Sequence, residues 1–187
     1  MKVARGRLLR NVAGTLGLLA AVAAVAVGLP AADRALPASR PVAAAPYLVG
    51  AGVTVIPPPG ALLDVTATRP GADHGTALFL LGGVRFVVVV SPFSGDVEAA
   101  AGRLRTKITG VRGNELAGAE SVTATATGLA GRQGGYAAPG RLGRYAVFRA
   151  AELAIEVTVA GTDPQLRATL AAVEASTRSI AFRGAAP

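Results

Sequence analysis

The chain has 187 residues, no cysteine and a formal net charge of +8, and half of its residues are hydrophobic. This length allows one folded domain with short additions. The lack of cysteine excludes disulfides, thiolate metal sites, a cysteine nucleophile and a lipid-accepting cysteine.

The positive charge is concentrated near the N-terminus. Residues 1–40 contain six basic residues and one acid, whereas residues 41–187 contain thirteen basic residues and ten acids, or a net +3. The rest of the chain is therefore only mildly basic. A strong nucleic-acid signal is not present in it.

An uncharged apolar run follows four early cations. The run covers residues 11–32, just long enough to cross a bilayer as a helix. Cations ahead of it predict that residues 1–10 stay in the cytoplasm and that the chain is a single-pass protein of the cell membrane. The alternative is a cleaved signal peptide, which would also export the rest of the chain.

Residues 33–46 are rich in proline and alanine and are predicted to form an extended tether. An extracytoplasmic domain of residues 47–187 then begins with four predicted strands. Two of these strands lie in GVTVIPPPG and LLDVTATRPG, and two more flank the hairpin glycines Gly82 and Gly83. The run from Phe86 to Val90 is apolar on both faces, as expected of a strand that is covered on each side.

A helical period follows in SGDVEAAAGRLRTKITGV, with Ser94 or Asp96 as the cap. Its predicted buried stripe consists of Val97, Ala101, Leu104, Ile108 and Val111.

Four more strands are predicted from ESVTATATG to LAIEVTVAG, with turns at Gly134-Gly135 and Pro139-Gly140. A last helix opens with a capping box of Thr162 and Gln165. Its predicted buried stripe is Leu166, Leu170, Val173, Thr177 and Ile180. The element order indicates an α+β fold, with a mainly antiparallel sheet packed by two helices.

These patterns resemble a known fold. GVTVIPPPG, RFVVVVSPF before a helix, and STRSIAF after the last one are similar to the PsbP/Mog1-like α/β/α sandwich of exported actinobacterial proteins, including the LpqN-like lipoproteins. The whole chain, with GRYAVF and EVTVAG, also resembles actinobacterial single-pass membrane proteins of no assigned function. The resemblance implies a domain that binds or scaffolds and has no catalytic residue set.

The sequence contains no recognisable set of catalytic residues. His74 is the only histidine and lies in a predicted turn, and no nucleophile elbow accompanies it. Carboxylates at Asp64, Asp73, Asp96 and Glu98 lack the spacing of a calcium loop, so no metal or other cofactor is expected. Glu152 and Glu156 are predicted to lie on the solvated face of a strand.

One stretch, GRQGGYAAPGRLGRYAVFRA from Gly131 to Ala150, combines glycine, arginine and two tyrosines without an acid. It leads into a strand and not into a helix, so it matches neither phosphate-binding glycine motif. Stacking on Tyr136 and Tyr145 would suit nucleic acid, but an exported domain makes that partner unexpected. We predict a hairpin with four basic side chains, Arg132, Arg141, Arg144 and Arg149. One interpretation is that these arginines are ordinary solvated side chains. The other is a hypothesis that they bind an anionic lipid, an anionic envelope polymer or an acidic protein partner.

The sequence therefore predicts a membrane-anchored extracytoplasmic accessory or binding module. The alternatives are a structural spacer and an envelope-associated enzyme that uses His74.

Overall fold

The computed structural model describes residues 38–184. The predicted segments 1–10 and 11–32 lie outside these residues. Within the described part, no helix combines the length and apolar character needed to span a bilayer.

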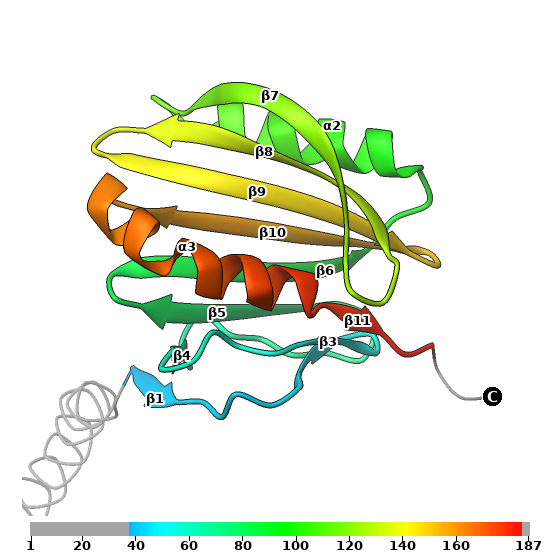
Figure 1. Cartoon of the computed structure of the whole chain (residues 1–187). Helices are drawn as coiled ribbons and strands as arrows, with labels where there is room; N and C mark the ends of the chain where they lie inside the picture. Colours follow the sequence, from blue (N-terminus) through cyan, green and yellow to red (C-terminus); the bar gives the residue numbers. More distant parts are fainter. Residues whose placement is uncertain (1–37, 185–187) are drawn as a thin grey trace, which may run out of the picture. The chain divides into compact units, whose positions relative to one another are not determined.

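The described residues form one compact unit built on an eight-stranded antiparallel sheet (Figure 1). The strands are β1 (Ser39–Pro41), β4 (Leu62–Asp64), β5 (Gly75–Leu81), β6 (Val84–Pro92), β7 (Glu115–Ala124), β8 (Ala130–Ala138), β9 (Arg141–Ala150) and β10 (Leu153–Gly161). They lie in the order β1-β4-β5-β6-β10-β9-β8-β7. The predicted meander β7-β8-β9-β10 is present, and β10 joins it to the hairpin of β5 and β6.

Two helices cover opposite faces of this sheet, α2 (Val97–Thr109) and α3 (Asp163–Arg178). In Figure 1, α3 crosses the front of the sheet and α2 lies behind it. Neighbouring residues of β9 show the division, because Val147 packs in the core under α2 whereas Phe148 packs in the core under α3. We call these two sides the α2 face and the α3 face. The predicted α+β fold with two helices is confirmed.

A second sheet of three short strands packs on the α3 face. It has the order β11-β3-β2, with β2 (Tyr47–Gly50), β3 (Val53–Val55) and β11 (Ala181–Phe182). Buried valines of β2 and β3 join the core of the large sheet. The sequence predicted β3 but neither β2 nor β11.

The helices begin where the sequence predicted. Asp96 accepts a hydrogen bond from the backbone N–H of Ala99 at 2.7 Å, so it caps α2. Gln165 Oε1 accepts one from the backbone N–H of Thr162 at 3.0 Å, as the capping box requires. Of the predicted stripe residues, Val97, Leu170 and Thr177 are only partly buried. Val111 is 55% exposed, because α2 ends before it.

The predicted tether and the second predicted strand are corrected. Residues 39–41 are not tether but form β1, which pairs with β4, so the folded unit starts at Ser39. LLDVTATRPG forms a strand only as far as Asp64. There Oδ1 of Asp64 accepts hydrogen bonds from the N–H groups of Thr66 and Ala67, and this turn ends the strand.

Candidate functional site

The glycine-rich stretch is the β8–β9 hairpin, and its glycines make room for tyrosine rings. Gly140 takes the positive φ of the predicted Pro139-Gly140 turn. The turn predicted at Gly134-Gly135 is wrong. Gly134 lies inside β8, opposite Tyr145. A Cβ at Gly134 would lie 2.6 Å from the Tyr145 hydroxyl oxygen, so a larger residue would displace the ring.

The same arrangement recurs two residues along the hairpin. Gly143 of β9 lies opposite Tyr136 of β8, and a Cβ there would lie 2.1 Å from the Tyr136 ring. Both rings are buried under α2, together with Leu104 and Ile108. The tyrosines are therefore core residues of the α2 face, and their rings are not exposed for nucleic-acid stacking.

Two ion-pair clusters flank α2. On the side of β7 and β8, Arg105 donates to Glu120 at 2.7 Å, and the Tyr145 hydroxyl donates to the same carboxylate at 2.9 Å. Burial raises the pKa of Glu120, but the hydrogen bonds from Arg105 and Tyr145 outweigh it and lower the pKa overall. Burial and the bond to Glu120 raise the pKa of Tyr145 to about 12.

The second cluster overturns the prediction that Glu156 is solvated. Glu156 is only 4% exposed. Its Oε1 accepts from Arg103 Nε at 3.0 Å, and its Oε2 accepts from Lys107 Nζ at 2.8 Å. The carboxylate is buried because α2 brings its own cations over it. The Glu152 side chain, in contrast, is 81% exposed, as predicted, although Glu152 lies in the turn before β10 and not in a strand.

The four predicted arginines do not form one contiguous surface. The strand register places Arg132, Arg141 and Arg149 on the α2 face and Arg144 on the α3 face. Arg132 pairs with Glu98 at 2.8 Å, and Arg149 donates to the carbonyl of Gly95 at 2.6 Å. Arg132 and Arg149 therefore bind within the domain itself.

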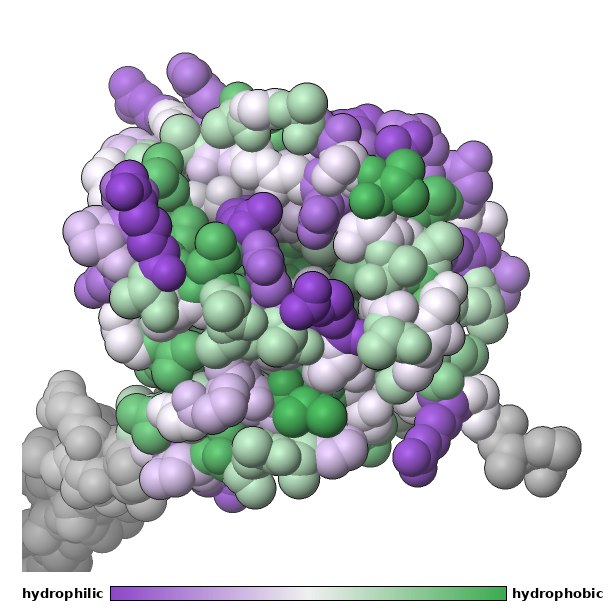
Figure 2. Space-filling model, viewed as in Figure 1, coloured by the Kyte–Doolittle hydropathy of each residue, from purple (hydrophilic) through white to green (hydrophobic). Residues whose placement is uncertain are grey.

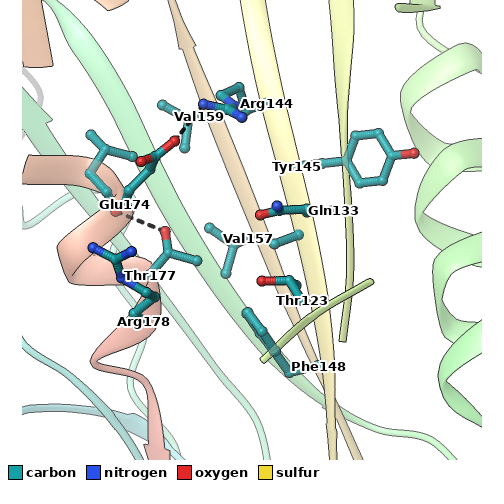
Figure 3. A pocket seen from close by; sticks show the side chains of 12 residues that line it. Thr123, Gln133, Arg144, Tyr145, Phe148, Val157, Val159, Glu174, Thr177 and Arg178 are labelled. Atoms are coloured by element: carbon teal, nitrogen blue, oxygen red, sulfur yellow. Dashed lines mark hydrogen bonds and ion pairs between the residues drawn. The ribbon is translucent and has the colours of Figure 1, made fainter. Parts of the chain in front are cut away.

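Arg144 borders a cavity of about 170 Å³ between α3 and the large sheet (Figure 3). Figure 2 shows this face of the molecule hollowed near its centre, with hydrophilic side chains around the opening. The floor is apolar and the rim is polar. The floor consists of Ala146, Phe148, Val157, Val159 and Val173, and the rim of Thr123, Gln133, Arg144, Glu174, Thr177 and Arg178.

The rim has groups free to bind a ligand. Arg144 Nη1 donates to Glu174 at 2.7 Å, and these side chains are 42% and 46% exposed, so solvent weakens the pair. The remaining guanidinium donors of Arg144 are available. Arg178 adds a second cation, and Gln133 and Thr123 point toward the same space (Figure 3). Tyr145 borders the cavity through its backbone only, because its ring points to the other face.

Sequence patterns identified this site poorly. Of the rim residues, only Arg144 was a predicted binding residue, and Thr177 was predicted only as part of the buried helix stripe.

The residues considered for catalysis and metal binding lie apart from this cavity. The His74 side chain is 68% exposed in a turn, and its Nδ1 lies 2.7 Å from a carboxylate oxygen of Asp73. This confirms the predicted exposed loop. Hydrogen bonds, chiefly from the Thr66 side chain, lower the pKa of Asp64. The Asp64 carboxylate thus stabilises the turn after β4. Across residues 38–184, no three acidic or histidine side chains gather as a metal site would require.

Comparison with known proteins supports the fold. No family model matches the chain, and no curated protein matches it. A cyanobacterial PsbP (CyanoP) from Synechocystis has a similar structure, with a TM-score of 0.51 and 14% identity over 71% of this chain and 87% of its own. A Pseudomonas aeruginosa protein of unknown function, described as a putative regulator, gives a TM-score of 0.49 and 16% identity over 59% of this chain and 85% of its own. The similarity to the cyanobacterial PsbP shows that the domain has a PsbP-like fold.

Proposed function

We propose that the chain is a membrane-anchored, extracytoplasmic accessory module that binds a partner through the cavity beside α3. The observation that carries this proposal is a polar rim around an apolar floor. The rim contains two arginines, Arg144 and Arg178. Such a site can bind a ligand through its polar rim and hold apolar atoms on its floor.

The size of the cavity limits what it can hold. Pockets for whole small molecules usually measure about 300–1,000 Å³, and this cavity measures about 170 Å³. It therefore suits one group carried by a larger molecule, such as a side chain or a headgroup. Because Arg144 and Arg178 outnumber Glu174 on the rim, that group is anionic. An anionic lipid, an anionic envelope polymer and an acidic protein all present such a group.

A short link to the predicted anchor fits this function. The sequence predicts that the anchor ends at residue 32, and the folded unit begins at Ser39. The six residues between them would reach about 20 Å at full extension. A domain held so near a membrane meets lipids and other envelope components first.

A panel of small fragments tests the cavity. We would record ligand-observed NMR of the full chain in nanodiscs with carboxylate, phosphate-ester, sugar and amine fragments of similar size. The carboxylates and phosphate esters should bind, and their signals should be lost with Arg144→Ala combined with Arg178→Ala. Ala168→Leu on the exposed side of α3 is the control. Equal binding by amines, or binding that survives loss of both arginines, would rule this site out.

The anchor needs a separate test. Alkaline carbonate should leave the chain in the membrane pellet. A shortened chain in the supernatant would show that the signal is cleaved, and it would leave the cavity proposal intact.

A further inference from the structure

Strand β6 is apolar on both faces, yet the domain buries only one of them. Phe86, Val88 and Val90 are at most 1% exposed on the α3 face. Val87 and Val89 point to the α2 face and remain partly exposed. A strand with this composition is expected to be covered on both sides.

The uncovered side results from the position of α2. This helix packs on β7, β8, β9 and β10 and leaves β6 beside it. Val111 follows the helix and is 55% exposed, although it continues the apolar period of the stripe. Three valines therefore border the same space without being buried in the domain.

This space is an open groove along the α2 face. It consists of two adjoining hollows of about 320 and 300 Å³ that share Asn114, Tyr136 and Thr158. Their apolar lining includes Val87, Val89, Leu104, Ile108, Val111, Ala138 and Ala160. Together they are several times larger than the cavity beside α3 and suit an extended chain.

The second hollow carries two cations. Arg85 and Arg141 both border it, and both residues are exposed. Among residues 38–184, neither guanidinium forms an ion pair. The groove therefore has a positive end that an anionic group would complement.

The middle of the groove distinguishes a peptide from an acyl chain. The Asn114 amide and the Thr158 hydroxyl border both hollows, and neither side chain hydrogen-bonds to another described residue. A hydrocarbon tail would remove these groups from water without replacing their hydrogen bonds, which is costly. A peptide backbone supplies both donors and acceptors at this point.

From these features we infer that the groove binds an extended segment of a partner protein that carries apolar side chains and carboxylates. The apolar side chains cover Val87, Val89 and Val111. The carboxylates pair with Arg85 and Arg141. This site is independent of the cavity beside α3 and lies on the opposite face of the sheet.

A library of short random peptides displayed on phage tests this inference. We would select binders on the full chain in nanodiscs, remove those that bind empty nanodiscs, and compare the remaining peptides on the wild type and on the double variant Arg85→Glu/Arg141→Glu. Selected peptides should combine Asp or Glu with Val, Leu, Ile or Phe. Fluorescence anisotropy should then show that the double variant weakens binding by about tenfold or more.

Matched variants make the result specific. Arg183→Glu makes one of the same arginine-to-glutamate changes at an exposed position of the chain away from the groove and should leave binding unchanged. Arg144→Ala should also leave it unchanged, which separates this site from the cavity beside α3. An unaltered thermal midpoint of the double variant shows that it is folded.

Three results would overturn the inference. One is that no binder remains once the peptides that bind empty nanodiscs are removed. Another is that acidic peptides bind the double variant as tightly as the wild type. The last is that labelled dodecanoate, a single-chain anionic lipid, displaces the peptides and itself depends on Arg85 and Arg141.

Discussion

Replacing Gly143 by alanine tests whether the glycine-rich hairpin exists to pack its tyrosines. The new Cβ would lie 2.1 Å from Cζ of Tyr136, whereas carbon atoms in contact lie about 3.5–4.0 Å apart. The ring has little room to retreat, because Tyr136 is 8% exposed and its hydroxyl donates to the carbonyl of Val159 at 3.2 Å.

The expected cost follows from these contacts. Forcing an extra carbon into a packed core costs about 1–3 kcal/mol, and losing the Tyr136 hydrogen bond costs about 0.5–1.5 kcal/mol. Replacing glycine by alanine within a strand returns about 0.5–1 kcal/mol of chain entropy. Gly143→Ala should therefore lower the free energy of unfolding by about 0.5–4 kcal/mol, out of the stability of about 5–15 kcal/mol that a domain usually has.

Urea unfolding of residues 39–187, followed by far-UV circular dichroism, measures this change. Gly102→Ala in α2 is the matched control, because its new Cβ would meet only the flexible end of the Arg105 side chain, at 3.7 Å. It should stabilise the domain by about 0.5–1 kcal/mol. Tyr136→Leu should remove most of the penalty of Gly143→Ala, because the two changes share one contact. A Gly143→Ala domain as stable as the wild type would refute this account of the hairpin.

Further predictions concern the α2 face and the start of the domain. Leu104→Asp should cost several kcal/mol, because it buries a charge at a position 3% exposed, and an unchanged urea midpoint would contradict the packing of α2. The lowered pKa of Glu120 gives stability that is present above pH 4.5 and lost as the pH falls through the folded-state pKa. The pKa of Tyr145, raised to about 12, gives stability that is present below pH 10 and lost as the pH rises from 10 toward 12. Unfolding midpoints across pH should show both losses. Tyr145→Phe should reduce the alkaline loss and leave the part that comes from Tyr136, whose pKa is also raised by burial; an unchanged alkaline loss in this variant would assign all of it to other groups. A fragment of residues 47–187 should unfold at lower urea than one of residues 39–187, since it lacks β1; equal midpoints would show that β1 adds no stability.

The sequence predicted the features that neighbouring residues determine. Gly82 and Gly83 adopt the positive φ values of their hairpin, and Asp96 and Gln165 make their capping bonds. Each of these depends on residues within a few positions along the chain. The alternating and helical periods likewise identified most of the long strands and both helices of the described domain.

Features that depend on distant residues escaped prediction. Glu156 is buried because Arg103 and Lys107, about fifty positions earlier in the chain, lie above it. Gly134 resembles a turn residue until the β8–β9 register places a tyrosine ring over it. The cavity beside α3 needs both the strand order and the crossing of α3, and no local pattern contains either.

The distribution of arginine partners shows why charge alone did not locate a binding surface. Arg132 and Arg149 belong to the acid-free stretch that first suggested an anionic ligand, yet both find partners inside the domain. Arg85 stood alone in an apolar strand and gave no such signal. It becomes notable only because the fold leaves the valines beside it uncovered and brings Arg141 to the same hollow. A cation beside unburied apolar surface is thus the better indicator of a docking site in this domain, since water satisfies a lone cation but not the valines around it.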